Sequence, residues 1–210
     1  MRRSPNRSDA YTLVEMIVSV AVILSLALLL VRPAGRANRG KAQRIRCVDN
    51  LKNLSLATRI YSLNYHGRSF ESFFATTNSG EIAHYFRALS NEISTPNLLV
   101  CPTDLRARPA ANFTNLTGTN ISYFLNRTAR FDQPEEFLFG DRNLSTNRTS
   151  LSSRAILQVS PDRNIHWTKE MHVDLGIIAM SDGSVRQFHS QRLREQLSKM
   201  AHLRTELLFP

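Results

Sequence analysis

A predominantly apolar stretch, Thr12–Val31, constrains this chain more than any other feature, and Glu15 is its one charged residue. As a helix rising about 1.5 Å per residue, such a stretch spans roughly 30 Å, the thickness of a bilayer core. It is longer than the apolar region of a secretory signal peptide, which has about 7–15 residues. It is also apolar on every face, unlike a helix that covers a core. The sequence therefore predicts a transmembrane helix over residues 11–31.

A carboxylate near the start of a membrane span needs a partner, and the neighbours of Glu15 suggest one. The order Ala10-Tyr11-Thr12-Leu13-Val14-Glu15 resembles the processing site of type IV prepilins and type II secretion pseudopilins. Ala10 stands where that family has glycine, and Tyr11 where phenylalanine is commoner. The resemblance implies a leader, residues 1–10, that a prepilin peptidase removes between Ala10 and Tyr11 before the new amine is methylated. It also implies that Glu15 attracts the Tyr11 ammonium of a neighbouring subunit during assembly.

The orientation of the predicted span rests on the same resemblance. Three arginines precede the apolar stretch, and six basic residues follow it within residues 32–46, so counting charges alone places the C-terminal side in the cytoplasm. The resemblance implies the opposite: a single pass through the bacterial inner membrane, a short cytoplasmic leader and the bulk of the chain on the periplasmic side. The implied partners are the peptidase, inner-membrane lipid before assembly, and other pilin-like subunits in a periplasmic or surface filament.

Residues 32–65 are predicted to form a stalk helix, interrupted near Pro33 and Gly35. From Lys41 onward, spacings of three and four place six residues on one stripe: Cys47, Leu51, Leu54, Thr58, Tyr61 and Tyr65. A smaller apolar strip consists of Ile45, Leu56 and Leu63. We assign the larger stripe to a globular head and the smaller strip to neighbouring stalks. The alternative is that both face one thick core.

The two cysteines, Cys47 and Cys101, leave two interpretations open. In an exported domain they form one disulfide; otherwise they are two buried thiols. Neither belongs to a CxxC pair, so the spacing does not predict a structural zinc site.

The remaining residues, 66–210, are expected to form the head. Four of its features look like segments of a pilin-like family, together with Arg46–Leu54 of the stalk: Leu99–Asp104, Ser122–Asn126, Gly140–Leu144, and a histidine followed after nine residues by Asp-Gly, here His172, Asp182 and Gly183. The resemblance implies an α+β fold, in which a long N-terminal transmembrane and stalk helix packs on a small, mainly antiparallel sheet.

The residues of the signature predict a hairpin. Leu175–Met180 and Ser184–Phe188 are strand candidates, and Asp182-Gly183 suits a tight turn between them. The alternative role is a calcium site that uses Asp174 and Asp182, although calcium prefers six or more oxygen ligands. Further strands are predicted at 121–125, 136–139 and 155–159, loops at 110–120 and 141–154, and a final helix at 191–208.

The sequence has no nucleophile elbow, phosphate loop or HExxH motif, so we predict no catalysis and no cofactor other than the calcium alternative. The expected function is that of a structural subunit of a type II secretion pseudopilus or type IV pilus-like filament. The net charge of +10 supports a second possibility, a membrane-tethered minor pilin whose basic head binds DNA or another polyanion.

Overall fold

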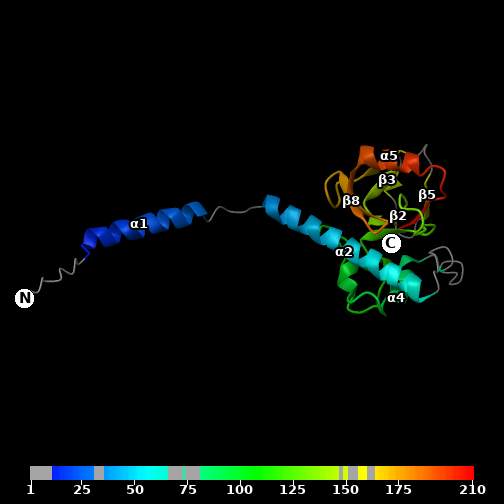
Figure 1. Cartoon of the computed structure of the whole chain (residues 1–210), viewed down its shortest axis with the longest axis horizontal. Helices are drawn as coiled ribbons and strands as arrows, with labels where there is room; N and C mark the ends of the chain where they lie inside the picture. The colour runs from blue at the N-terminus through cyan, green and yellow to red at the C-terminus, as the bar shows by residue number, and fades with distance from the viewer. Residues whose placement is uncertain are drawn as a thin grey trace, which may run out of the picture. The chain divides into compact units, whose positions relative to one another are not determined.

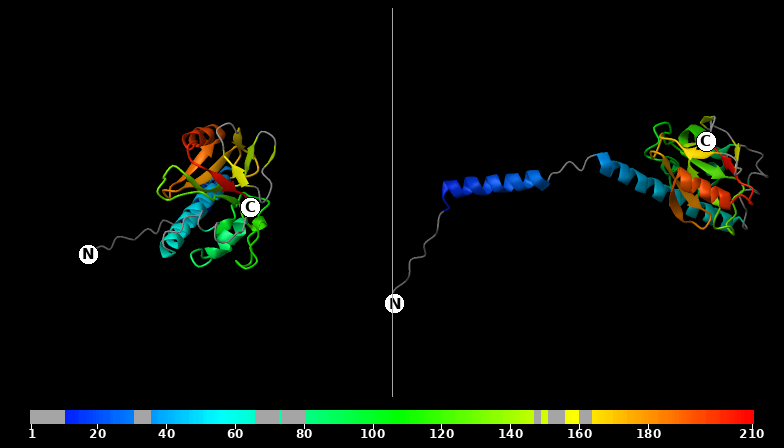
Figure 2. Two further views of the ribbon diagram at one scale, coloured as in Figure 1. Left: turned by 90° about the vertical axis from the view of Figure 1, so that its right-hand side faces the viewer. Right: turned by 90° about the horizontal axis from the view of Figure 1, so that it is seen from above.

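The structure is a computed structural model that describes residues 11–30, 36–65, 73, 81–146, 149–150, 156–159 and 164–210. The chain forms two compact units, Met1–Arg39 and Gly40–Pro210. Figures 1 and 2 show the helices and strands of the second unit, to which most of α2 belongs. The predicted leader with Ala10, and the predicted interruption at Pro33 and Gly35, lie outside the described residues.

The first helix, α1, covers Leu13–Leu30. Its 18 residues rise about 27 Å, less than the roughly 30 Å of a bilayer core. No helix within the described ranges is both long and apolar enough to cross a membrane. The predicted transmembrane helix over residues 11–31 is therefore wrong. The same finding corrects the predicted fold class, which included a transmembrane stalk, and the predicted single-pass location in an inner membrane.

The second helix, α2, covers Arg36–Asn64 and supplies one wall of the core of the larger unit. The predicted core stripe is buried along most of its length, with Cys47, Leu51 and Leu54 fully enclosed. At about 100° per residue, the smaller strip of Ile45, Leu56 and Leu63 lies on the opposite side of the helix. These three side chains are 59–75% exposed. The two strips therefore do not face one thick core, and the smaller one is free to contact another molecule.

The larger unit is built around a six-stranded antiparallel sheet with the order β5-β9-β1-β2-β7-β8. The strands are β1 (Tyr123–Asn126), β2 (Phe137–Asp141), β5 (Ile156–Gln158), β7 (Leu175–Met180), β8 (Val185–His189) and β9 (Glu206–Leu208). The unit is thus α+β with an antiparallel sheet, as the sequence predicts, although the sheet has more strands than the sequence indicates.

Both faces of this sheet are covered, which explains why its central strands are continuously buried instead of alternating. On one face, Tyr123, Leu125 and Ile177 join a cluster with α2 and with the short helix α4 (Ile82–Ala88). On the other face, Phe124 and Ile178 join a second cluster beneath α5 (Ser190–Lys199). Figure 1 shows α2 and α5 on opposite sides of the strands.

A second, three-stranded sheet has the order β4-β3-β6, and two of its strands, β3 and β4, lie within residues 141–154, which the sequence predicts to be loop. Its strands are β3 (Leu144–Thr146), β4 (Thr149–Ser150) and β6 (Ile165–Trp167). Trp167 packs closely over the backbone of β7, because a Cβ added at Gly176 would lie 2.3 Å from its ring. The predicted final helix is also partly wrong, since α5 ends at Lys199 and the chain returns as β9 to pair with β1 and β5.

Candidate functional site

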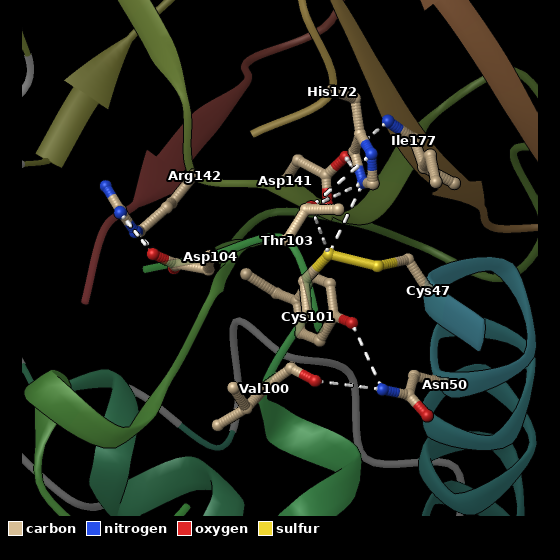
Figure 3. Close-up of a disulfide and its surroundings, with 11 residues drawn as sticks. Cys47, Asn50, Val100, Cys101, Thr103, Asp104, Asp141, Arg142, His172 and Ile177 are labelled. Carbon is tan, nitrogen blue, oxygen red and sulfur yellow. Dashed lines mark hydrogen bonds and ion pairs between the residues drawn. A yellow bond between two sulfur atoms is a disulfide. The ribbon is translucent and has the colours of Figure 1, made fainter. Parts of the chain in front are cut away.

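A disulfide between Cys47 and Cys101 ties α2 to the segment that follows the 3-10 helix η1 (Pro96–Leu99). Of the two interpretations of these cysteines, the structure has the disulfide, and both residues are fully buried. One helical turn further along α2, Asn50 donates a hydrogen bond of 3.1 Å from Nδ2 to the carbonyl oxygen of Val100. The helix and this segment are therefore joined by a covalent bond and a polar contact side by side (Figure 3).

The imidazole of His172 contacts this disulfide directly. Its Nε2 lies 3.3 Å from Cys101 Sγ and 3.5 Å from Asp141 Oδ2, and the hydroxyl of Thr103 lies 3.4 Å from its Nδ1. Asp141 stands at the end of β2, where Oδ2 accepts a hydrogen bond of 2.7 Å from the backbone N–H of Ile177 on β7. Side chains from three separate segments therefore converge on one buried imidazole (Figure 3).

Burial favours the neutral forms of both titratable partners. It raises the pKa of Asp141 to about 8, against the opposing effect of the Ile177 N–H. Burial also lowers the pKa of His172 to about 4, and the positive charge of Arg44 acts in the same direction. Although the two groups are close enough for an ion pair, a neutral imidazole and a carboxylic acid are the favoured forms at neutral pH.

Beside this centre, Arg142 and Asp104 form a buried ion pair. The guanidinium donates two hydrogen bonds to the carboxylate, from Nε at 2.7 Å and from Nη2 at 2.6 Å, and a third from Nη1 to Glu170 at 3.1 Å. Burial alone would raise the pKa of Asp104, but the hydrogen bonds and charge of Arg142, with smaller contributions from neighbouring donors such as the Arg106 N–H, together leave this pKa below its usual value. The pair joins the end of β2 to the segment that carries Cys101.

The bend after His172 is unusual. Val173 and Asp174 follow each other with φ of 51° and 59°, in the left-handed region that a β-branched residue such as valine rarely adopts. The bend leads directly into β7, so it helps to fix where the imidazole lies. Strain of this kind is maintained only where the surroundings enforce it.

The two parts of the predicted signature lie at opposite ends of β7. Asp182 and Gly183 form the hairpin turn between β7 and β8, where Gly183 has φ of 85°. The Asp182 carboxylate accepts a hydrogen bond from the Ser184 N–H at 2.7 Å and contacts Arg186 at 3.2 Å. A six-residue strand spans about 20 Å, so His172 does not bond this turn. The nine residues between His172 and Asp182 are the six residues of β7, two residues before the strand and one after it.

The Glu15 carboxylate has a hydrogen-bond partner at the start of its own helix, Thr12. Thr12 donates its backbone N–H to Glu15 Oε2 at 2.9 Å, and the Glu15 N–H reaches Thr12 Oγ1 at 3.3 Å. This reciprocal pair is a capping box, which the order Thr-x-x-Glu at a helix start predicts. The bonds from Thr12 lower the pKa of Glu15. Tyr11, the other predicted assembly residue, is 83% exposed.

Among the described residues, one group of three or more metal-ligating side chains is close enough to hold an ion: Cys47, Cys101 and His172. Asp174 and Asp182, the predicted calcium ligands, do not belong to it. A cavity of about 430 Å³ adjoins the group, and its wall includes Cys101, Asn50 and Asp104.

The shifted pKa values of the buried Asp141 and His172 predict that the stability of the protein depends on pH. An unfolded Asp141 loses its proton near pH 3.8 and the folded one near pH 8, so between these values the folded state holds the extra proton and stability falls as pH rises. The His172 shift, from 6.5 to about 4, has the opposite sign and offsets this fall up to about pH 6.5. The free energy of unfolding is therefore expected to fall by on the order of 1–2 kcal/mol between about pH 6.5 and 8.

Urea unfolding of the oxidised protein, with a chelator present, measures this dependence. Asp141→Asn should remove the fall between pH 6.5 and 8. Asp132→Asn is the control, because the Asp132 side chain is 72% exposed. A fall of equal size in Asp141→Asn would assign the effect to another group.

Three of the segments that resemble the pilin-like family meet around His172. Arg46–Leu54 supplies Cys47, Leu99–Asp104 supplies Cys101 and Thr103, and Gly140–Leu144 supplies Asp141. The ion pair and the Asp141–His172 contact were not predicted, since no local spacing connects residues so far apart. The sequence feature that could have indicated this site is the acidic and basic pair Asp141-Arg142 directly after an apolar run.

Comparisons with protein-family models, curated proteins and solved structures each give no match to this chain.

Proposed function

We propose that this chain is a pilin-like structural subunit of a type II secretion pseudopilus or type IV pilus-like filament, whose copies associate through their helices. The observation that carries the proposal is the surface of α1. Eleven large apolar side chains between Leu13 and Leu28 are each 50–77% exposed, on every face of the helix. A helix that is apolar on every face does not stay exposed to water, and other protein or lipid is expected to cover it.

The outer strip of α2 supports association between copies as well. Ile45, Leu56 and Leu63 are exposed along one line, and Ile60, 40% exposed, lies beside them. Exposed apolar residues at this spacing suit a helix that packs against another helix.

The head suits a mechanical role. The disulfide and the hydrogen bond from Asn50 to Val100 join α2 to the segment that carries Cys101, and a hydrogen bond from Asn50 to Tyr123 joins α2 to β1. The buried Asp104–Arg142 pair joins that segment to the end of β2. Cross-links of this kind keep a domain folded while its helix is held in an assembly.

The outer strip gives a direct test. The purified full chain is expected to form regular filaments or discrete oligomers, seen by electron microscopy and light scattering. Leu56→Glu/Leu63→Glu should weaken association at least about tenfold, because it buries two charges in the contact. Asn53→Glu/Asn64→Glu adds the same charges at exposed polar positions of the same helix and should have little effect. A wild-type protein that stays monomeric, or equal effects of both pairs, would contradict the proposal.

The role of Glu15 is separable from its capping box. In a chain that begins at Tyr11, Glu15→Gln keeps an oxygen for the Thr12 N–H but removes the charge that would attract a neighbour's amine. Glu15→Ala removes both. If Glu15 pairs between subunits, both variants should assemble poorly. If it only caps α1, Glu15→Gln should assemble as the wild type does.

A further inference from the structure

We propose that the Cys47–Cys101 disulfide is the oxidised form of a zinc site, and that a dithiol reductant converts it into a site where Cys47, Cys101, His172 and Asp141 bind one Zn²⁺. This inference does not depend on association between copies. Nothing in the cysteine spacing predicts it, because the ligands come from four distant parts of the chain.

The donor atoms are already close together. One ligand atom from each of Cys47, Cys101 and His172 lies within 4.8 Å of the others. Tetrahedral zinc, with bonds of about 2.3 Å to sulfur and 2.0 Å to nitrogen, requires donors roughly 3.3–3.8 Å apart. Shifts of the side chains are therefore sufficient, and the fold does not have to rearrange.

Asp141 is not one of the three residues whose donor atoms already lie within 4.8 Å of one another, but it adjoins them and is proposed as the fourth ligand. Its Oδ2 lies 3.5 Å from the same Nε2 of His172 that contacts Cys101 Sγ. The Ile177 N–H orients this carboxylate, and its other oxygen, Oδ1, is buried without a hydrogen-bond partner among the described residues. Ligands of zinc sites are commonly held by hydrogen bonds of this kind.

Both positive and negative side chains lie near the reduced, loaded site, in which two thiolates and one carboxylate around Zn²⁺ leave a net charge of about −1. The positive charge of Arg44 acts on His172, whereas at Asp141 the Asp104 carboxylate has a larger effect than Arg142. The Thr103 hydroxyl, 3.1 Å from Cys101 Sγ, can donate a hydrogen bond to the thiolate. The adjoining cavity has Cys101 in its wall, although the residue is fully buried.

The redox step is balanced. The dithiol transfers two electrons and two protons to the S–S bond, which breaks to give two protein thiols, and the dithiol itself becomes a disulfide. Zinc binding then releases three protons to solvent, one from each of the two thiols and one from the Asp141 carboxylic acid. The oxidised form cannot bind in this way, because disulfide sulfurs carry no negative charge.

The test uses the full chain in anaerobic buffer, with Co²⁺ and then Zn²⁺ as probes. A water-soluble phosphine reduces the disulfide. The reduced protein is expected to bind one Co²⁺ per chain with the absorption of tetrahedral cobalt thiolate, and Zn²⁺ should displace it. The oxidised protein should bind neither ion. Zinc should also raise the Tm of the reduced protein but not of the oxidised one.

Two histidine variants distinguish zinc binding at the proposed four-ligand site from zinc binding by the two cysteine thiols alone. His172→Asn leaves both cysteines in place and should weaken zinc binding at least about 100-fold, as expected for loss of a direct ligand. His166→Asn, on β6, should change it less than about threefold. Equal affinity of the His172→Asn variant and the wild type would overturn the proposal. Binding to the oxidised form, or a reduced protein that zinc does not stabilise, would overturn it too.

Discussion

Replacing Arg142 with methionine is expected to lower the free energy of unfolding by about 3–5 kcal/mol, because it leaves the Asp104 carboxylate buried without its cation. The Asp104 side chain is fully buried and that of Arg142 is 5% exposed, so water cannot replace the lost hydrogen bonds. Urea unfolding of the full chain, with the disulfide intact, measures the loss.

Two further variants show whether the loss comes from the unpaired charge. Arg186→Met breaks a surface ion pair in which the Arg186 side chain is 39% exposed and the Asp182 side chain 32% exposed. It should lower the free energy of unfolding by less than about 1 kcal/mol. Arg142→Met/Asp104→Leu removes both buried charges and should recover much of the stability, since a well-packed apolar pair commonly replaces a buried ion pair without loss. A loss below about 1 kcal/mol in Arg142→Met would mean that Asp104 finds another partner or takes up a proton.

Removing the disulfide should have an effect of similar size. It joins residues separated by 54 positions, and closing a loop of this length stabilises the folded state by about 4 kcal/mol in the chain-entropy treatment. The variant Cys47→Ala/Cys101→Ala should lose this amount, together with a smaller contribution from the two sulfur atoms removed from the core.

Reduction of the wild type in the presence of a chelator provides an independent measurement. It should reproduce most of the loss, whereas the same reductant should leave the double alanine variant unchanged. A wild type whose unfolding midpoint is insensitive to reductant would show that the cross-link contributes little to stability.

Much of the local structure was predictable from residue spacing. The three- and four-residue spacing of apolar residues predicted α2 and its buried face, because each helical turn returns to the same side. Short apolar runs in the sequence predicted the central strands β1, β2 and β7, and Asp182-Gly183 predicted the turn, because glycine readily adopts the positive φ that a hairpin requires.

Other elements depended on partners distant in sequence. Residues 206–208 have no strand pattern of their own, and they form β9 because β1 and β5 offer hydrogen bonds on both sides. Likewise β3 and β4, in a stretch rich in serine, threonine and asparagine, are held by pairing with each other and with β6. Intrinsic propensity is a weak predictor of strands that neighbours complete.

The sequence by itself determined α2 and its buried face, the central strands β1, β2 and β7, the turn at Asp182-Gly183, and an apolar helix at the N-terminal side of the head. Only the tertiary structure decided that β3, β4 and β9 are strands, and that Cys47, Cys101, Asp141 and His172 meet. The physical reason is that periodicity reports local geometry and burial, whereas a site is made by side chains that approach only after sheet order and register are established.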